Sequence, residues 1–192
     1  MTSRRYLVVH GLRNHRSPEH WQYWLVSRLR DRGEQVLYPQ LPSPDDPVLS
    51  DWLEVLRTEL GMLGDGERIV LCHSLGCWLW LNHAETAQVE HKVDRLLLVA
   101  PPGLSRQDAQ IQGFKPASLD RFLLSRTVST GAELACSDAD PWCPEGSKDL
   151  YGDRLGLRTH VIEGGGHLSI DDGFGPWPQV EAWALTGRGL VS

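Results

Sequence analysis

The sequence has no long hydrophobic run. A helix that crosses a membrane needs about 20 mainly apolar residues, and no segment of this chain approaches that length. The N-terminal segment MTSRRYLVVHG has two arginines and then an apolar run of only four residues, which is shorter than the apolar region of a signal peptide. We therefore expect a cytoplasmic protein that does not enter or bind a membrane.

Cysteine is scarce, with four residues in a chain of 192. Their spacing forms no pair of C-x-x-C motifs, so a structural zinc site is not expected. The cytoplasm keeps thiols reduced, and free thiols are therefore predicted for all four cysteines. They are Cys72, Cys77, Cys136 and Cys143.

The chain also lacks an excess of positive charge. Its 25 Asp and Glu residues outnumber its 19 Lys and Arg residues, which gives a net charge of −6. Proteins that bind nucleic acids usually present a basic face, so this class of function is not expected. The sequence contains no H-E-x-x-H motif, no G-x-G-x-x-G motif and no Walker lysine. We therefore expect neither a metal ion nor a cofactor.

Short apolar runs alternate with amphipathic segments along the whole chain. The apolar runs predict buried strands at residues 6–9, 35–38, 69–72, 94–100, 133–136 and 159–162. The amphipathic segments predict helices after each of the first three strands, near 147–155 and at 177–185. Continuous apolar strands that alternate with helices indicate an α/β fold, with a mostly parallel sheet of about six strands and helices on both faces.

Capping residues predict where the first two helices begin. Ser17 followed by Pro18 is typical of a helix N-terminus, and Gly33 is expected to end that helix. Asp51 and Glu54 can form a capping box at the start of the next helix.

The length and composition predict one domain over residues 1–192. Hydrophobic residues make up 41% of the chain and charged residues 23%, which is an ordinary globular balance. Residues 101–130 are the least regular stretch, and we expect them to form a flap or small lid. They are too few for a large cap domain.

Polar residues follow the predicted strands at the place where ligands bind. In an open parallel sheet this place is the carboxyl end of the strands. Ser74 follows the third strand. Asp138 and Asp140 follow the fifth strand, and His167 follows the sixth. A serine, an acid and a histidine in this chain order are typical of α/β-hydrolases.

These residue types can perform acyl transfer. A serine hydroxyl is a weak nucleophile until a base takes its proton, and a histidine with a pKa of about 6.5 suits that task. A carboxylate on the second ring nitrogen fixes the tautomer. We predict Ser74 as nucleophile, His167 as base and Asp140, in the form D-P-x-x-P, as the orienting acid. Asp138 is the alternative acid.

Ser74 lies in the pentapeptide CHSLG, which is close to the nucleophile elbow G-x-S-x-G. Small residues on either side of the serine let strand and helix approach each other. Gly76 supplies one of them, and Cys72 stands in place of the other glycine. A thiol is small and buries well, so we expect Cys72 to be tolerated.

Backbone N–H groups are needed to stabilise an oxyanion. We expect them from Leu75, at the start of the third helix, and from Leu12, in the loop after the first strand. Arg13 is the less favoured alternative to Leu12. Trp142 follows the acid loop and is a candidate wall of the substrate pocket, and His10 is a possible pocket residue.

Other histidines lie near the predicted site. His10 and His73 flank Ser74 along the chain, and we interpret them as structural or pocket-lining residues rather than bases. His15 and His20 lie in or near the loop to the first helix, where they are candidates to line the entrance of the site, and a surface role is the favoured interpretation.

Four segments resemble one known group of proteins. They are VVHGLRNHRSPEHWQYW, LCHSLGC, SDADPWCP and GGGHLSIDDGFGPWP. The chain resembles the small serine hydrolases of the α/β-hydrolase superfamily typified by retinoblastoma-binding protein 9 and bacterial YdeN. This resemblance implies a compact α/β-hydrolase fold without a large cap domain. It also implies a triad of Ser74, Asp140 and His167 with esterase-like activity on small acyl substrates.

The sequence thus favours a serine hydrolase, a carboxylesterase that acts on small acyl esters through an acyl-enzyme. The alternative is a catalytically idle binding module on the same fold. All three triad positions and the glycine after His10 are present, which favours the hydrolase.

Overall fold

The computed structural model describes residues 3–86 and 92–190. In these residues six strands form one sheet in the order β2-β1-β3-β4-β5-β6, and all neighbouring strands are parallel. The predicted, mostly parallel sheet of about six strands is confirmed. The strands are β1 (Arg4–Val9), β2 (Gln35–Leu37), β3 (Glu67–His73), β4 (Val93–Val99), β5 (Val128–Ser137) and β6 (Arg158–Ile162).

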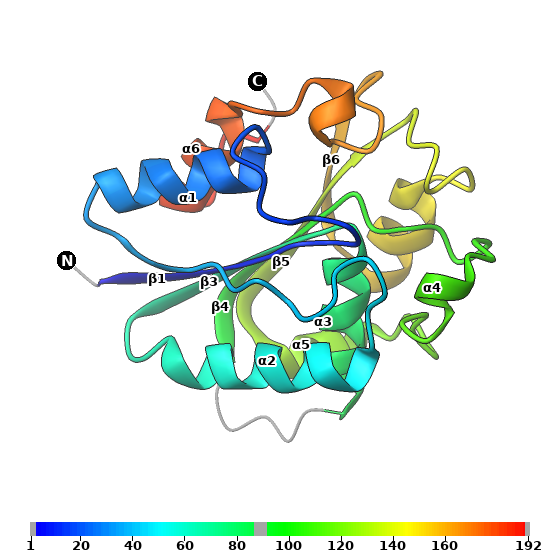
Figure 1. Cartoon of the computed structure of the whole chain (residues 1–192), viewed down its shortest axis with the longest axis horizontal. Helices are drawn as coiled ribbons and strands as arrows, with labels where there is room; N and C mark the ends of the chain where they lie inside the picture. Colours follow the sequence, from blue (N-terminus) through cyan, green and yellow to red (C-terminus); the bar gives the residue numbers. More distant parts are fainter. Residues whose placement is uncertain (1–2, 87–91, 191–192) are drawn as a thin grey trace.

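Helices cover both faces of the sheet, as predicted. In Figure 1, α1 and α6 lie above the sheet, whereas α2, α3 and α5 lie below it. None of the helices in the described part of the chain is long and apolar enough to cross a membrane. The helices are α1 (Trp21–Asp31), α2 (Leu49–Met62), α3 (Leu75–Thr86), α4 (Ala109–Gln112), α5 (Arg121–Thr127), the π-helix η1 (Lys148–Asp153), the 3-10 helix η2 (Ile170–Asp172) and α6 (Pro178–Thr186).

The sheet separates two apolar layers. Successive side chains of a strand point to opposite faces, so Tyr6 and Val8 pack with α1 and α6, whereas Leu7 and Val9 pack with α2 and α3. Large fully buried aromatic side chains fill both layers. These are Trp21, Trp183 and Tyr6 in the α1 and α6 layer, and Trp52, Trp78, Trp80, Tyr151 and Phe114 in the other.

The predicted start of α1 is wrong. The helix begins at Trp21, because residues 17–20 form a turn in which the His20 N–H donates to the Ser17 carbonyl at 3.0 Å. His20 is the N-cap, and its Nδ1 accepts the Gln22 N–H at 3.1 Å. The imidazole thus replaces the hydroxyl that the sequence suggested as a cap.

The predicted capping box of α2 is also wrong. The N-cap is Val48, whose carbonyl accepts the Trp52 N–H at 3.1 Å, so the helix begins before Asp51. Asp51 lies in the first turn instead, where a negative charge interacts favourably with the helix dipole.

Residues 101–130 do not form a separate flap. Ile111, Phe114 and Leu124 of this stretch are buried in the layer of α2 and α3. The stretch ends in α5 and the start of β5, and both belong to the core architecture. Only its first part lies over the loops: the Ser105 N–H and hydroxyl each donate to the Glu145 carboxylate at 2.9 Å. Because these apolar side chains belong to the core, this part of the stretch packs into the domain and does not cover it as a flap.

The direction of the crossovers changes at β1. The chain passes from β1 to β2 on one side and then to β3 on the other side. In such sheets the carboxyl ends of the two strands at the change of direction open a crevice. The residues after β1 and β3 therefore meet at this crevice.

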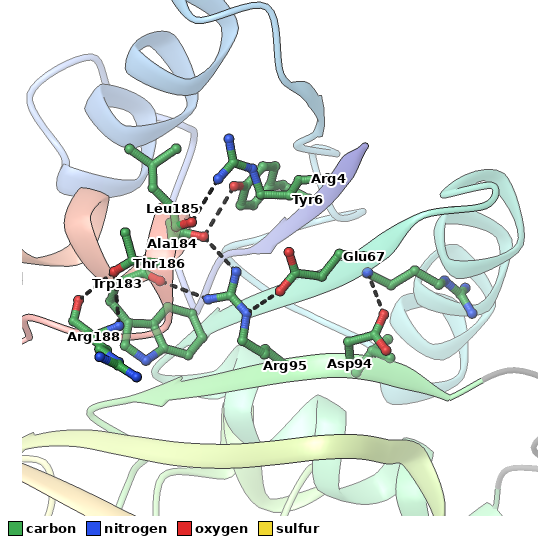
Figure 2. Close-up of polar contacts among 12 residues, drawn as sticks. Arg4, Tyr6, Glu67, Asp94, Arg95, Trp183, Ala184, Leu185, Thr186 and Arg188 are labelled. Carbon is green, nitrogen blue, oxygen red and sulfur yellow. Dashed lines mark hydrogen bonds and ion pairs between the residues drawn. The ribbon is translucent and has the colours of Figure 1, made fainter. Parts of the chain in front are cut away.

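The opposite, amino-terminal edge of the sheet holds α6 in place through Arg95 of β4 (Figure 2). The Arg95 guanidinium donates to the Trp183 carbonyl at 2.8 Å and to the Ala184 carbonyl at 2.9 Å. Its Nε donates to Glu67 Oε1 of β3 at 2.7 Å. These carbonyls belong to the last turn of α6, where carbonyls lack a full set of helical partners, and the Trp183 carbonyl also accepts the Gly187 N–H at 2.7 Å.

Two residues of β1 complete this contact. The Tyr6 hydroxyl donates to the Ala184 carbonyl at 3.1 Å, and Arg4 donates to the Leu185 carbonyl at 2.7 Å (Figure 2). The helix then ends at Gly187, whose φ of +72° suits a residue without Cβ. Side chains from two strands, β1 and β4, thus donate to the carbonyls at the C-terminal end of the last helix.

Replacement of Arg95 by methionine should destabilise the protein. It would remove three hydrogen bonds of a charged donor and leave Glu67 without its partner, while the Ala184 and Trp183 carbonyls would keep only the Tyr6 hydroxyl and the Gly187 N–H. We expect the free energy of unfolding to fall by roughly 2–4 kcal/mol. Urea denaturation measures this change. The exposed Arg158 of β6 gives a matched control, since Arg158→Met should change the value by less than about 0.5 kcal/mol. Equal effects of the two substitutions would contradict the role of Arg95.

Candidate active site

Ser74 occupies the sharp turn between β3 and α3. Its φ is +53°, in the left-handed region that residues with a Cβ rarely adopt. The Ser74 N–H donates to the Val99 carbonyl of β4 at 2.9 Å, and the Ser74 carbonyl accepts the Cys77 N–H at 2.8 Å. Both peptide groups of the serine are thereby fixed, and its side chain lies at the carboxyl edge of the sheet.

Two glycines allow this turn to approach the loop after β1. A Cβ at Gly76 would lie 2.8 Å from the His10 carbonyl oxygen, and a Cβ at Gly11 would lie 2.8 Å from Cβ of Ser74. Cys72 is fully buried in the layer of α2 and α3. A glycine is therefore required on the helix side of the elbow, whereas a small side chain fits on the strand side.

Ser74, His167 and Asp140 form a continuous row of hydrogen bonds. Nε2 of His167 lies 2.8 Å from Oγ of Ser74, and Nδ1 lies 2.9 Å and 3.0 Å from the two Asp140 oxygens. Because a carboxylate only accepts, Nδ1 carries the proton and Nε2 accepts from the Ser74 hydroxyl. All three side chains belong to buried residues, so water screens the row little.

The two candidate acids have different positions. Asp140 is buried and reaches His167, and its Oδ1 also accepts the Trp142 N–H at 2.8 Å. Asp138 is exposed, and its Oδ1 accepts the Gly164 N–H at 2.7 Å. Asp138 thus connects the acid loop to the loop of His167, whereas Asp140 contacts the imidazole itself.

Asp172, which sequence reasoning missed, holds the loop of His167. Its Oδ2 accepts the His167 N–H at 2.9 Å, the Ser169 hydroxyl at 2.8 Å and the Ser169 N–H at 3.2 Å. A Cβ at Gly166 would overlap the Asp172 carboxylate, so this glycine leaves room for it. The capping-box spacing of Ser169 and Asp172 is the sequence signal that could have found this contact.

His73 contacts the backbone of His167. Its Nε2 lies 3.1 Å from the His167 carbonyl oxygen, so Nε2 carries the proton and donates. The rings of His20, Trp21 and His167 pack around it, with centroids 5.1, 5.7 and 5.2 Å away. Burial, together with the neighbouring His20 and His167, lowers the pKa of His73 well below 6.5 and keeps the ring neutral.

His10 lies beneath the cleft rather than in its wall. The residue is fully buried, its Nδ1–H donates to the Gly11 carbonyl at 2.8 Å, and its Nε2 accepts the Leu41 N–H at 2.9 Å. It therefore positions the loop after β1 from inside. His20, expected at the surface, is buried as the cap of α1, whereas His15 is exposed at the mouth of the cleft.

The expected oxyanion donors lie on the two segments that meet at the elbow. Gly11 and Leu75 approach closely, because a Cβ at Gly11 would lie 3.2 Å from the Leu75 nitrogen. Among the described residues, the N–H groups of Leu12 and Leu75 have no acceptor. The Arg13 N–H, the alternative donor, is occupied by the Pro44 carbonyl at 2.8 Å.

A cleft of about 450 Å³ opens above these groups. Leu12, Trp142 and Ile170 give it apolar walls, and Ser74 and His167 lie among its lining residues. The Trp142 ring lies 5.5 Å from the His167 ring, centroid to centroid, and the Arg106 guanidinium lies 4.2 Å from the Trp142 centroid. The remaining lining residues are Gly11, Arg13, Asn14, His15, Ser17, His20, His73, Ser169 and Asp171.

Other nucleophiles are unsuited to this site. All four cysteines are free and buried, which confirms the prediction of free thiols. Burial raises the pKa of Cys72 well above its usual value, and that of Cys143 to about 11, so these thiols stay protonated. In residues 3–86 and 92–190 no three His, Cys, Asp or Glu side chains are grouped so that they could share a metal ion.

Comparison with known proteins identifies the family. The family model described as serine hydrolase matches residues 6–185. The chain belongs to the serine hydrolase family. A relative within it is the hydrolase YdeN of Bacillus subtilis (strain 168), which is 30% identical over 181 residues that cover 94% of this chain and 93% of YdeN.

Solved structures show that this serine hydrolase has the α/β-hydrolase fold. The crystal structure of YdeN from B. subtilis matches it with a TM-score of 0.82, 27% identity and coverage of 97% of this chain and 98% of YdeN. A YdeN-like hydrolase from Pectobacterium atrosepticum matches with a TM-score of 0.74 and 21% identity, over 99% and 94% of the two chains. An α/β-hydrolase-fold protein from Burkholderia ambifaria matches with a TM-score of 0.63 and 15% identity, and the match covers 97% of this chain and 91% of that protein. The resemblance and the compact fold predicted from the sequence are confirmed.

The elbow should tolerate a change at Cys72 but not at Gly76. Cys72→Gly removes a small buried side chain, so we expect hydrolysis of a p-nitrophenyl ester to continue and the free energy of unfolding to fall by about 1–2 kcal/mol. Gly76→Ala would place a methyl group against the His10 carbonyl and should lower the rate by about tenfold or more. Loss of activity in a folded Cys72→Gly protein would show that the thiol has a further role.

Stability should fall between pH 6.5 and pH 4. Burial lowers the pKa of His10 and His20 to about 4, whereas the unfolded chain keeps values of about 6.5. In this window the unfolded chain binds more protons, so the stabilisation is fully present above pH 6.5 and is lost on acidification. We expect a loss on the order of 3 kcal/mol for each histidine, measured by urea denaturation. His20→Asn, which keeps a capping oxygen, should flatten the profile; an unchanged profile would contradict this assignment.

Proposed function

We propose that this serine hydrolase is a carboxylesterase that acts on small acyl esters. The observation that supports this most directly is the hydrogen-bonded row of Ser74, His167 and Asp140 at an open cleft. The positive φ of Ser74 adds to it, because a strained turn of this kind exposes the nucleophile in α/β-hydrolases.

In the proposed acylation step, Oγ of Ser74 attacks the ester carbonyl carbon while Nε2 of His167 takes the hydroxyl proton. Asp140 pairs with the imidazolium that forms. In this proposal the N–H groups of Leu75 and Leu12, which have no acceptor among the described residues, donate to the negatively charged oxygen of the tetrahedral intermediate. When the intermediate collapses, the bond to the alcohol oxygen breaks, and His167 returns the proton to the leaving alcohol.

Water then releases the acyl group. His167 takes one proton from the water as its oxygen attacks the acyl carbon on Ser74. Collapse of the second intermediate breaks the bond to Oγ, and Oγ recovers the proton from His167. The products are a carboxylic acid and the free enzyme.

The cleft supports a preference for short or aromatic acyl groups. Its volume is about 450 Å³, and Leu12, Trp142 and Ile170 form apolar walls near Ser74. Apolar surface that an acyl group covers contributes to binding in proportion to its area. A small-molecule ester is therefore the proposed substrate.

Ser74 should be labelled by a fluorophosphonate probe. Its hydroxyl is activated by His167, so wild-type protein should react covalently and Ser74→Ala should not. Mass spectrometry of the modified peptide locates the label. If folded wild-type protein stays unlabelled, or if Ser74→Ala reacts equally, the hydrolase proposal is wrong and the idle binding module gains support.

Substitutions of Asp140 and Asp138 can be compared to test which carboxylate is the acid of the triad. Asp140→Asn should lower kcat for p-nitrophenyl butyrate by roughly 10³-fold or more, because the amide no longer fixes the His167 tautomer. Asp138→Asn keeps an oxygen that can accept the Gly164 N–H and should retain most of the activity. The reverse order would assign the acid to Asp138.

A further inference from the structure

Both peptide groups of His167 are bound by side chains. Its N–H donates to Oδ2 of Asp172 at 2.9 Å, and its carbonyl accepts from Nε2 of His73 at 3.1 Å. We call the side chains of His73 and Asp172 the His167 clamp. A histidine ring can be aligned by its own partners, but the clamp fixes the backbone from which that ring extends.

The loop that carries His167 needs such fixation. Gly164 and Gly166 have φ values of +63° and +58°, and Leu168 has a φ of +51°. Glycines have much conformational freedom, and a leucine rarely adopts a positive φ. The native conformation of this loop is therefore one of several that the chain can adopt, and contacts with side chains such as those of His73 and Asp172 are needed to stabilise it.

His73 connects this loop to the nucleophile. It precedes Ser74 directly and is the last residue of β3, where it pairs with Val99 of β4. The packed rings of His20 and Trp21 restrict its side chain. The end of β3 therefore carries the donor to the His167 carbonyl, and the turn that follows it directly carries the Ser74 hydroxyl. Two adjacent residues thus contact the backbone and the ring of His167.

Asp172 acts on the other side of the same residue. It receives the His167 N–H together with both donors of Ser169, so its carboxylate is held by three hydrogen bonds. Gly166 makes room for it. His73 belongs to β3 and Asp172 to η2, and the ring nitrogens of His167 have Asp140 and Ser74 as their hydrogen-bond partners.

We propose that His73 and Asp172 are positioning residues that set the distance between Ser74 and His167. This inference rests on the proposed hydrolase function, in which His167 is the base. Loss of the Asp172 half of the clamp should lower kcat and leave KM nearly unchanged, because the chemical step depends on the Ser74–His167 geometry and Asp172 is not among the residues that line the cleft. A displacement of about 1 Å can lower a rate by roughly 10²-fold.

The test compares His73→Leu with His73→Gln on p-nitrophenyl butyrate. Leucine has no donor for the His167 carbonyl, whereas the glutamine amide can supply one near the position of Nε2. We expect kcat to fall by roughly 10²-fold in His73→Leu and to recover most of that loss in His73→Gln. His83→Leu on α3 is the matched control: Nδ1 of His83 has no partner within the described residues, and its loss should leave kcat unchanged.

A second pair of variants keeps the test independent of how His73→Leu folds. Asp172 is exposed, so its replacement disturbs no core. Asp172→Asn retains an amide oxygen that can accept the His167 N–H, whereas Asp172→Ala retains none. We expect kcat of Asp172→Asn to exceed that of Asp172→Ala by about tenfold.

Proton NMR provides a readout that does not depend on turnover. The Nδ1 proton of His167, bound to Asp140, should give a downfield resonance in wild type, His73→Gln and His83→Leu, and should exchange with water in His73→Leu. If wild-type protein neither reacts with the probe nor hydrolyses esters, the hydrolase proposal fails, and the resonance still shows whether His73 positions His167.

The positioning role is contradicted if His73→Leu keeps the wild-type kcat and the downfield resonance. It is also contradicted if His73→Gln loses as much kcat as His73→Leu.

Discussion

The close approach of the elbow to the loop after β1 is the constraint on which the site depends. Because β1 and β3 pair directly, with Val9 opposite Cys72, the residues that follow them have to pass each other within van der Waals distance. Gly11 and Gly76 lack the Cβ atoms that would prevent this passage. The left-handed turn at Ser74 then presents the hydroxyl beside free backbone N–H groups.

Burial keeps three histidines around this turn neutral, and each forms a different structural hydrogen bond. His10 holds the Gly11 carbonyl, His20 caps α1 and His73 donates to the loop of His167. A positive charge on any of them would oppose the imidazolium that forms on His167 during acyl transfer. Neutral rings can donate and accept hydrogen bonds in fixed directions without that electrostatic cost.

The sequence predicted the fold well because apolar runs and chain order are properties of local segments and sheet topology. It also placed Ser74 and His167 at the correct strand ends. The D-P-x-x-P form favoured Asp140 over Asp138, and Asp140 is the one that contacts His167. The sequence failed where contacts between distant segments decided the structure. Asp172, by contrast, becomes a partner of His167 only after the glycine-rich loop folds back, so local sequence did not indicate it.

The helix starts failed for the same physical reason. Ser17 has the better intrinsic preference for the N-cap position, but His20 caps α1 through its ring nitrogen. The His20 ring packs against Trp21 and His73, and these contacts hold it at the cap position.

Arg95 binds the last turn of α6 at the amino-terminal edge of the sheet, at the opposite end of the strands from the cleft. The loops around the cleft can therefore be exchanged or lengthened without breaking these hydrogen bonds. This separation makes the chain a small scaffold for building hydrolases of altered selectivity.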